Sequence, residues 1–148
     1  MNNKYLYKKF ALSFLFSLTI FFCHISKSHA GKYGTGELKL SSGMVDYFIQ
    51  YIRGEQHRYP SIFYTTLDGT DGVFWYCSEM TNCRSGSPSQ EKLQCLQVTG
   101  KECKAFARKR TVKWENGINS GKGKTSKINS KWSDQEIRDK LKELGFIE

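Results

Sequence analysis

The chain has 148 residues, with 23 Lys and Arg against 14 Asp and Glu, which gives a formal net charge of +9. This length, less the first thirty residues discussed below, is enough for one domain with one modest core. The excess of positive charge favours anionic partners such as lipid surfaces, polysaccharides or nucleic acids.

Residues 1–30 have the layout of a secretory signal peptide. A lysine-rich start is followed by an apolar run over residues 10–23 and by a small-x-small sequence directly before Gly31. The run is shorter than the ~20 apolar residues that span a bilayer. We therefore expect cleavage near Gly31 and an exported protein, either periplasmic or secreted. The alternative is an uncleaved signal helix that anchors the protein in a membrane. A lipid anchor is disfavoured because the bulky Phe22 precedes Cys23.

Removal of residues 1–30 lowers the net charge to +5, because this segment holds four lysines and no acidic residue. Ten of the remaining basic residues lie between Lys101 and Lys131, where the acidic residues are Glu102 and Glu115. Such a stretch can attract an anionic lipid, polysaccharide or nucleic acid. The favoured interpretation is a solvated basic strand and tail, and a dedicated anion site is the alternative.

Four cysteines follow the signal, and they are Cys77, Cys83, Cys95 and Cys103. An even number of cysteines in a short exported domain predicts two disulfides. The pairs Cys77–Cys83 and Cys95–Cys103 are favoured because each closes a short loop. A zinc site is disfavoured because the spacing lacks the closely spaced pair of cysteines typical of zinc. A redox-active pair is disfavoured because the chain has no C-x-x-C sequence.

The first elements after the signal are a short strand and a helix. Residues 37–40 alternate in polarity and predict a strand. Apolar residues at helical spacing predict a helix over residues 43–53, capped by Ser41 or Ser42 and ended by Gly54.

A hairpin and a second helix follow. Residues 61–67 and 73–77 are rich in β-favouring side chains and flank a turn sequence at residues 68–72. The next helix is predicted over residues 87–98, with Ser87 as its cap and Gly100 at its end. We expect the side chains of Cys95 and Leu96 to lie on its inner face.

The last part of the chain contains a strand, a polar segment and a helix. Residues 103–108 predict a strand, and residues 111–114 either continue it or pair back on it. Residues 116–131 are rich in Gly, Ser, Asn and Lys, which predicts a basic flexible linker. A capping box at Ser133 predicts a helix to residue 144, which docks on the domain or on a partner because so short a helix is marginal alone. Its apolar stripe comprises Ile137, Leu141 and Leu144, with Gly145 as its end and Phe146 folding back on it.

This order of elements predicts an α+β fold. We expect an antiparallel sheet of four to five strands with two helices on one face, and a ferredoxin-like β-α-β-β-α-β arrangement is one candidate. The expected organisation is a signal peptide at 1–30, a disulfide-stapled α+β domain at 31–115, the linker at 116–131 and a C-terminal helix at 132–148.

No motif in the sequence predicts a catalytic, cofactor or metal site. His57 is the one histidine beyond the signal, and no G-x-S-x-G nucleophile sequence is present. A hydrolytic enzyme with an unrecognised site therefore stays an alternative to a binding protein.

The hairpin carries aromatic side chains on both of its faces, and basic residues follow in the next strand. Such a surface suits a glycan or an anionic polymer, and export disfavours RNA. The residues of this possible partner surface are Trp75, Tyr76, Arg108, Lys109, Arg110 and Lys113. The favoured interpretation, however, is that the extra rings pack under the C-terminal helix.

The stretch 60–114 contains a spaced series of turn glycines, cysteines and aromatic residues. Its members are Ile62 to Gly69, Tyr76-Cys77, Cys83, Cys95, Gly100, Cys103, Phe106-Ala107, Arg110, Val112 and Trp114. The series resembles small exported proteobacterial proteins of unknown function with a YC…C…C…G…C…FA…R…V.W pattern. This resemblance implies export and a shared fold, and it brings no catalytic residue.

Together these features predict a non-catalytic binding or structural protein of the cell envelope. Its expected partner is an envelope protein or an anionic polymer, its contact with a membrane is confined to the signal segment, and no cofactor is implied. The sequence leaves the oligomeric state open.

Overall fold

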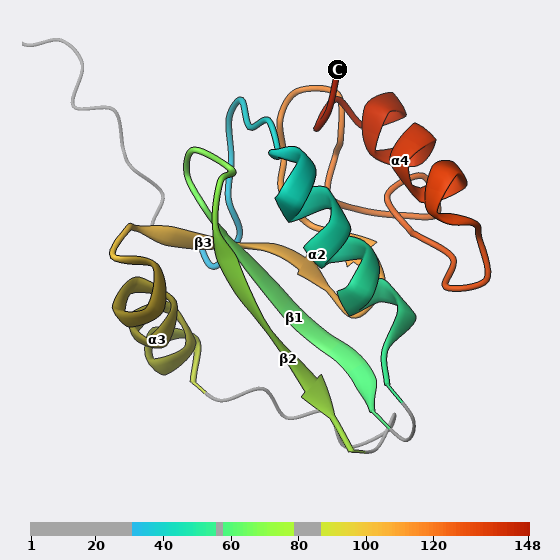
Figure 1. Cartoon of the computed structure of the whole chain (residues 1–148). Helices are drawn as coiled ribbons and strands as arrows, with labels where there is room; N and C mark the ends of the chain where they lie inside the picture. Colours follow the sequence, from blue (N-terminus) through green and yellow to red (C-terminus); the bar gives the residue numbers. More distant parts are fainter. Residues whose placement is uncertain (1–30, 56–57, 79–86) are drawn as a thin grey trace, which may run out of the picture. The chain divides into compact units, whose positions relative to one another are not determined.

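The computed structural model describes residues 31–55, 58–78 and 87–148 (Figure 1). The predicted signal peptide, His57 and Cys83 lie outside the described residues. Residues Gly31–Glu148 form one compact unit. Within the described part of the chain, no helix is long and apolar enough to cross a membrane.

An antiparallel sheet with the strand order β2-β1-β3-β4 organises the fold. The elements in chain order are α2 (Ser42–Arg53), β1 (Tyr59–Thr66), β2 (Gly72–Cys77), α3 (Pro88–Thr99), β3 (Cys103–Arg108), β4 (Thr111–Val112) and α4 (Asp134–Glu143). The predicted α+β class, with four antiparallel strands, is confirmed. Residues 111–112 pair back on β3 rather than continuing it.

Local capping signals set the ends of the helices. The Ser41 side chain accepts a hydrogen bond from the backbone N–H of Met44 at 3.3 Å, and Gly54 ends α2 with a φ of 72°. Ser87 caps α3 in the same way, and Gly100 ends that helix in the left-handed conformation. The predicted capping box of α4 is confirmed, because Ser133 and Glu136 each bond to the backbone of the other.

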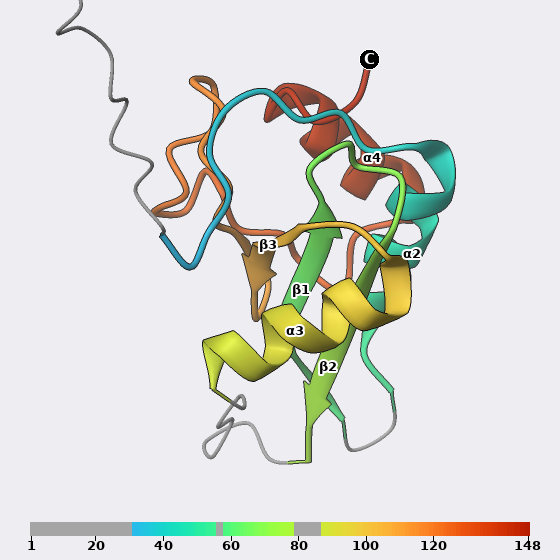
Figure 2. The same ribbon diagram turned by 90° about the vertical axis from the view of Figure 1, so that its left-hand side faces the viewer.

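The two faces of the sheet carry separate cores, because neighbouring side chains on a strand point to opposite faces. Phe63 belongs to the larger core under α2 and α4, whereas Ile62 and Tyr64 belong to the smaller core, which includes Cys95 of α3. Figures 1 and 2 show α3 on one side of the sheet and α2 and α4 on the other. The expectation that the helices at residues 43–53 and 87–98 cover the same face is therefore wrong, since α2 and α3 lie on opposite faces. The order of elements does not specify which face the connection after β2 crosses.

Residues 37–40 are not a strand. Their alternation is real, since Leu38 and Leu40 are buried in the larger core, but the backbone makes only scattered hydrogen bonds, such as Leu40 N–H to the carbonyl of Phe146 at 2.9 Å. The sheet thus lacks the first strand of a ferredoxin-like arrangement, and that candidate is wrong.

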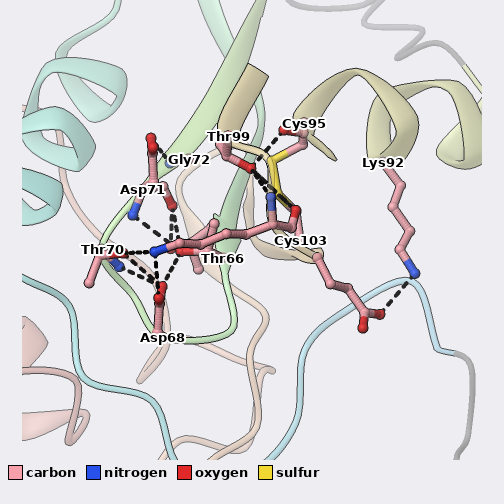
Figure 3. The surroundings of a disulfide bond; sticks show 12 residues. Thr66, Asp68, Thr70, Asp71, Gly72, Lys92, Cys95, Thr99 and Cys103 are labelled. Carbon is pink, nitrogen blue, oxygen red and sulfur yellow. Dashed lines mark hydrogen bonds and ion pairs between the residues drawn. A yellow bond between two sulfur atoms is a disulfide. The ribbon is translucent and has the colours of Figure 1, made fainter. Parts of the chain in front are cut away.

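A disulfide between Cys95 and Cys103 ties the end of α3 to the start of β3 (Figure 3). Its Cα atoms are 6.2 Å apart, and both side chains are fully buried. This predicted pair is confirmed. Cys77 is also disulfide-bonded, and its predicted partner lies outside the described residues.

The inner face of α3 differs from the prediction. Leu96 is 44% exposed, while Glu91 is buried and accepts a hydrogen bond from the Tyr64 hydroxyl at 3.0 Å. The expectation that Leu96 faces the core is wrong, because the helix turns Glu91 and Cys95, four residues apart, toward the sheet.

Residues 116–131 pack against the domain and are not a flexible linker. Ile128 is fully buried in the larger core, and Asn119 and Ser126 are buried and hydrogen-bonded to each other at 2.6 Å. The Asn119 amide also donates to the carbonyl of Trp114 at 2.7 Å. The composition misleads here because polar side chains bonded to buried backbone can order a segment that has few apolar residues.

The C-terminal helix docks on the domain itself. Its predicted stripe of Ile137, Leu141 and Leu144 is buried in the larger core. After α4 the chain reverses at Gly145, where Phe146 N–H bonds to the carbonyl of Leu141 at 2.9 Å. The Phe146 ring then meets that of Phe106 edge-on at 4.9 Å between centroids.

Candidate anion-binding site

Basic side chains without a carboxylate partner gather in one stretch of the chain. Several cations elsewhere are paired, as in Lys101 with Asp68 at 2.7 Å and Arg53 with Asp134 at 2.6 Å. In the described residues, no ion pair involves the basic side chains from position 108 to position 131. These residues are Arg108, Lys109, Arg110, Lys113, Lys122, Lys124, Lys127 and Lys131. The result is an uncompensated positive potential over this part of the surface.

Three of these cations meet in a cavity of about 450 Å³, which we call the basic cavity. Its polar and aromatic lining comes from Arg110, Lys124, Lys127, Asn129, Ser130 and Trp132, and the buried Ile128 completes it. No carboxylate is among these lining residues. The cavity therefore combines positive charge with one aromatic wall.

Arg110 is held by the turn between β3 and β4. Its Nε donates to the carbonyl of Ile52 at 3.2 Å, near the C-terminus of α2, where a cation compensates the negative end of the helix dipole. The Tyr51 hydroxyl donates to the carbonyl of Lys109 at 2.7 Å and fixes the same turn. Burial raises the pKa of Tyr51 well above its ordinary value, so this hydroxyl keeps its proton.

Pairing with β4 positions the lysine-bearing segment. Val112 N–H donates to the carbonyl of Ser126 at 2.9 Å, and Ile128 N–H donates to the carbonyl of Arg110 at 2.8 Å. Between these two bonds, Lys127 forms an antiparallel bridge with Thr111. Lys127 therefore emerges beside Arg110, although the two are 17 positions apart in the sequence.

Trp132 is held by the loop that precedes α4. Its backbone N–H donates to the carbonyl of Asn129 at 3.3 Å, and its half-buried ring packs against the larger core. Arg53 of α2 donates to the carbonyl of Ser130 at 2.6 Å and pairs with Asp134 at the start of α4. These contacts fix the loop between two helices and hold the indole in place as a wall.

The lining groups suit the binding of an anion. The free nitrogens of Lys124, Lys127 and Arg110 are all donors, and charge-assisted hydrogen bonds are about twice as strong as neutral ones. The lining residues include no histidine, cysteine or carboxylate, which are the usual general bases. The arrangement can therefore hold an acceptor-rich group by charge and hydrogen bonds.

The structure does not bring the six predicted surface residues together. Trp75 lies on the α3 face, edge-on to Tyr64 at 5.8 Å, whereas Tyr76 lies on the α2 face and its hydroxyl donates to the carbonyl of Gln50 at 3.0 Å. Arg108 and Trp75 both pair with Ile62, so they flank it on the α3 face.

The other three predicted surface residues lie near β4. Lys109 is exposed at the turn, the Lys113 ammonium donates to the carbonyl of Gly121 at 3.1 Å, and Arg110 alone of the six lines the basic cavity. Trp75 and Tyr76 line a different cavity of about 490 Å³, which also holds Glu55 and has no excess of positive charge.

Three residues of the basic cavity were missed by sequence reasoning, namely Lys124, Lys127 and Trp132. The composition of residues 116–131 predicts a linker, and a linker does not build a cavity. The segment offered no decisive signal, because its two isoleucines look alike in the sequence while Ile128 is buried and Ile118 is exposed.

Comparisons with protein-family models, with curated proteins and with solved structures gave no match. The geometry and charge of the basic cavity are therefore the features from which a function can be inferred.

Proposed function

We propose that this chain is an exported, disulfide-containing binding domain that holds an anionic polymer of the cell envelope in the basic cavity. One observation carries the proposal: Arg110, Lys124 and Lys127 converge beside Trp132 in a cavity whose lining has no carboxylate. Cations brought together without counter-charge repel one another, and an anion placed among them relieves that repulsion.

Two features support the exported location. Residues 1–30 follow the pattern of a cleaved secretory signal. Disulfides persist in oxidising compartments such as the periplasm and are rare in the reducing cytosol, and this chain carries the Cys95–Cys103 bond.

Binding to immobilised anionic polymer, measured at several salt concentrations, tests the proposal. The protein is prepared by expression of the full chain, and the variant combines Lys124→Gln with Lys127→Gln. We expect at least tenfold weaker binding, because each lost charge-assisted hydrogen bond costs about 1.5–3 kcal/mol, and we expect the affinity of the wild-type protein to fall as salt rises.

The matched control combines Lys39→Gln with Lys142→Gln, which removes the same charge from exposed positions outside the cavity lining. Equal loss in both double variants would mean that net charge, and not the cavity, attracts the polymer. Binding that is indifferent to salt and to both variants would contradict the proposal.

A further inference from the structure

The basic cavity has one feature that a purely electrostatic surface does not need, which is its aromatic wall. Trp132 packs against the larger core on one side and lines the cavity on the other. It is the one aromatic side chain among the lining residues that the structure describes. An indole in this position offers a flat apolar face next to three cations.

The free hydrogen-bonding groups of the cavity are almost all donors. The Oδ1 of Asn129 already accepts from the backbone N–H of Lys131 at 3.0 Å, which leaves its amide nitrogen free to donate. The terminal nitrogens of Arg110 and the two lysine ammonium groups can only donate, and the Ser130 hydroxyl can do both. The complementary ligand is therefore rich in acceptor oxygens.

The volume indicates the size of that ligand. A space of about 450 Å³ lies within the usual range of ~300–1,000 Å³ for small-molecule sites. It accommodates a short stretch of sugar rings, or one ring with its charged substituent.

We infer that the basic cavity binds an acidic saccharide unit, whose ring stacks on Trp132 and whose carboxylate or sulfate is held by Arg110, Lys124 and Lys127. A pyranose ring has an apolar C–H face that fits an indole, hydroxyls that reach Ser130 and Asn129, and an anionic group for the cations. This inference rests on the proposed function, because it names the class of anionic polymer that the same cavity takes.

A nucleic acid fits the cavity less well. Proteins that bind single strands stack successive bases on several aromatic side chains, and this cavity has one. The edges of bases present donors as well as acceptors, and the nitrogens of Arg110, Lys124 and Lys127 can pair only with acceptors.

Binding of four anionic probes to the full-chain protein tests the inference at one ionic strength, with neutral dextran as the blank. An oligogalacturonate carries carboxylates, dextran sulfate carries sulfate esters, and polyphosphate and a single-stranded oligonucleotide carry phosphates without an acidic sugar. We expect at least one of the two saccharides to bind tenfold or more tightly than both phosphate probes. The stronger of the two identifies the anionic group.

The Trp132→Ala variant tests the stacking. It is expected to weaken saccharide binding by roughly tenfold, as the loss of aromatic stacking does in other polymer-binding sites, and to leave polyphosphate binding within about twofold. Trp132→Phe keeps a ring and should restore most of the affinity, which separates stacking from a defect in folding. Circular dichroism checks that both variants are folded.

The outcomes separate the two proposals. Equal binding of all four probes, unaffected by Trp132→Ala, would overturn the saccharide inference and leave the anionic site intact. Preference for the oligonucleotide would overturn it in favour of nucleic acid. Failure of every probe to bind would overturn the proposed function as well.

Discussion

Gly34 lies so close to the Trp114 ring that the position has no room for a larger side chain. Its backbone lies against the Trp114 indole, whose Nε1 donates to the carbonyl of Gly36 at 2.8 Å. A Cβ at Gly34 would lie 2.1 Å from the Trp114 ring. We expect Gly34→Ala to lower the free energy of unfolding by about 1–3 kcal/mol or more, because the core cannot take the extra methyl group without a shift.

Urea unfolding measures this loss, and Gly43→Ala is its control. Nothing lies within 4 Å of a Cβ at Gly43, which sits in α2. That substitution should be neutral or stabilise by roughly 0.5–1 kcal/mol. Identical urea midpoints for the two variants would show that Gly34 does not face the indole.

Three tyrosines with raised pKa values should make the protein less stable at high pH. Burial raises the pKa of Tyr51 and Tyr64 above the ordinary value, and it raises the pKa of Tyr76 to about 12. Above the ordinary tyrosine pKa of ~10, the unfolded chain loses these protons while the folded chain keeps them. The contribution to stability is thus fully present below pH ~10 and is lost as the pH rises.

The measurement is the free energy of unfolding between pH 8 and about pH 12. It should be level at first and fall beyond pH ~10, and Tyr76→Phe should make the fall less steep. The two proteins are compared by the slope of the unfolding free energy against pH, because Tyr76→Phe also removes the hydrogen bond to the carbonyl of Gln50 at all pH values. A flat profile through this range would contradict the raised pKa values of the three tyrosines.

At the scale of elements, the disulfide between Cys95 and Cys103 joins α3 to β3 across eight positions. In the chain-entropy description, closing so short a loop stabilises the fold by ~2.5 kcal/mol. The double variant Cys95→Ala with Cys103→Ala should therefore show a lower free energy of unfolding in urea, by about that amount.

The native protein should resist mild reductants at the bond between Cys95 and Cys103, because both sulfurs are buried. Rapid reduction without unfolding would contradict the burial.

The segment 116–131 offers a direct comparison between two isoleucines. Ile128 is fully buried, whereas Ile118 is 69% exposed. We expect Ile128→Ala to cost about 2–5 kcal/mol of stability and Ile118→Ala to cost little. The melting temperatures of both variants test this expectation. If residues 116–131 were a flexible linker, the two substitutions would lower the melting temperature equally little.

The elements with strong local signals were predictable from the sequence. Ser41, Ser87 and Ser133 are capping residues whose effect depends on the next three positions, and each begins its helix as expected. The turn at residues 68–72 is equally local: the Asp68 carboxylate accepts from the Thr66 and Thr70 hydroxyls, and β1 and β2 pair around it.

Features decided by long-range contacts were not predictable. Leu38 and Leu40 alternate as in a strand, yet the bridges to the sheet are made by residues just before them, since Tyr33 and Thr35 pair with Ala105 and Glu115. The face of the sheet on which α3 packs is set by contacts of its buried side chains with distant strands, such as that of Glu91 with Tyr64. The periodicity of one segment predicts neither these contacts nor the strand with which a segment pairs.

At the scale of the whole molecule, the candidate site is a product of the fold. Arg110 was predictable as part of a basic stretch, but its neighbours in the cavity come from a segment that folds back along β4 and from the approach to α4. The basic composition of residues 101–131 predicted the sign of the charge, and only the tertiary structure brings three of its cations together beside Trp132.

The proposed export of the chain is tested by the intact mass of the protein. We expect protein recovered from the cell envelope to begin near Gly31 and to contain no alkylatable thiol until it is reduced, after which all four of its cysteines should react. A chain that keeps residues 1–30 would support the membrane-anchored alternative. Four thiols that react without reduction would contradict export into an oxidising compartment.

The burial of Phe146 has a consequence for the order of events during synthesis. This ring lies beyond α4, and it fills the same core as Leu38, Phe48 and Phe106. Leu38 and Phe146 lie at opposite ends of the segment Gly31–Glu148 that forms the compact unit, so the core lacks one of its rings until nearly all of that segment has left the ribosome. The larger core therefore closes late in synthesis, after every strand of the described sheet has been made.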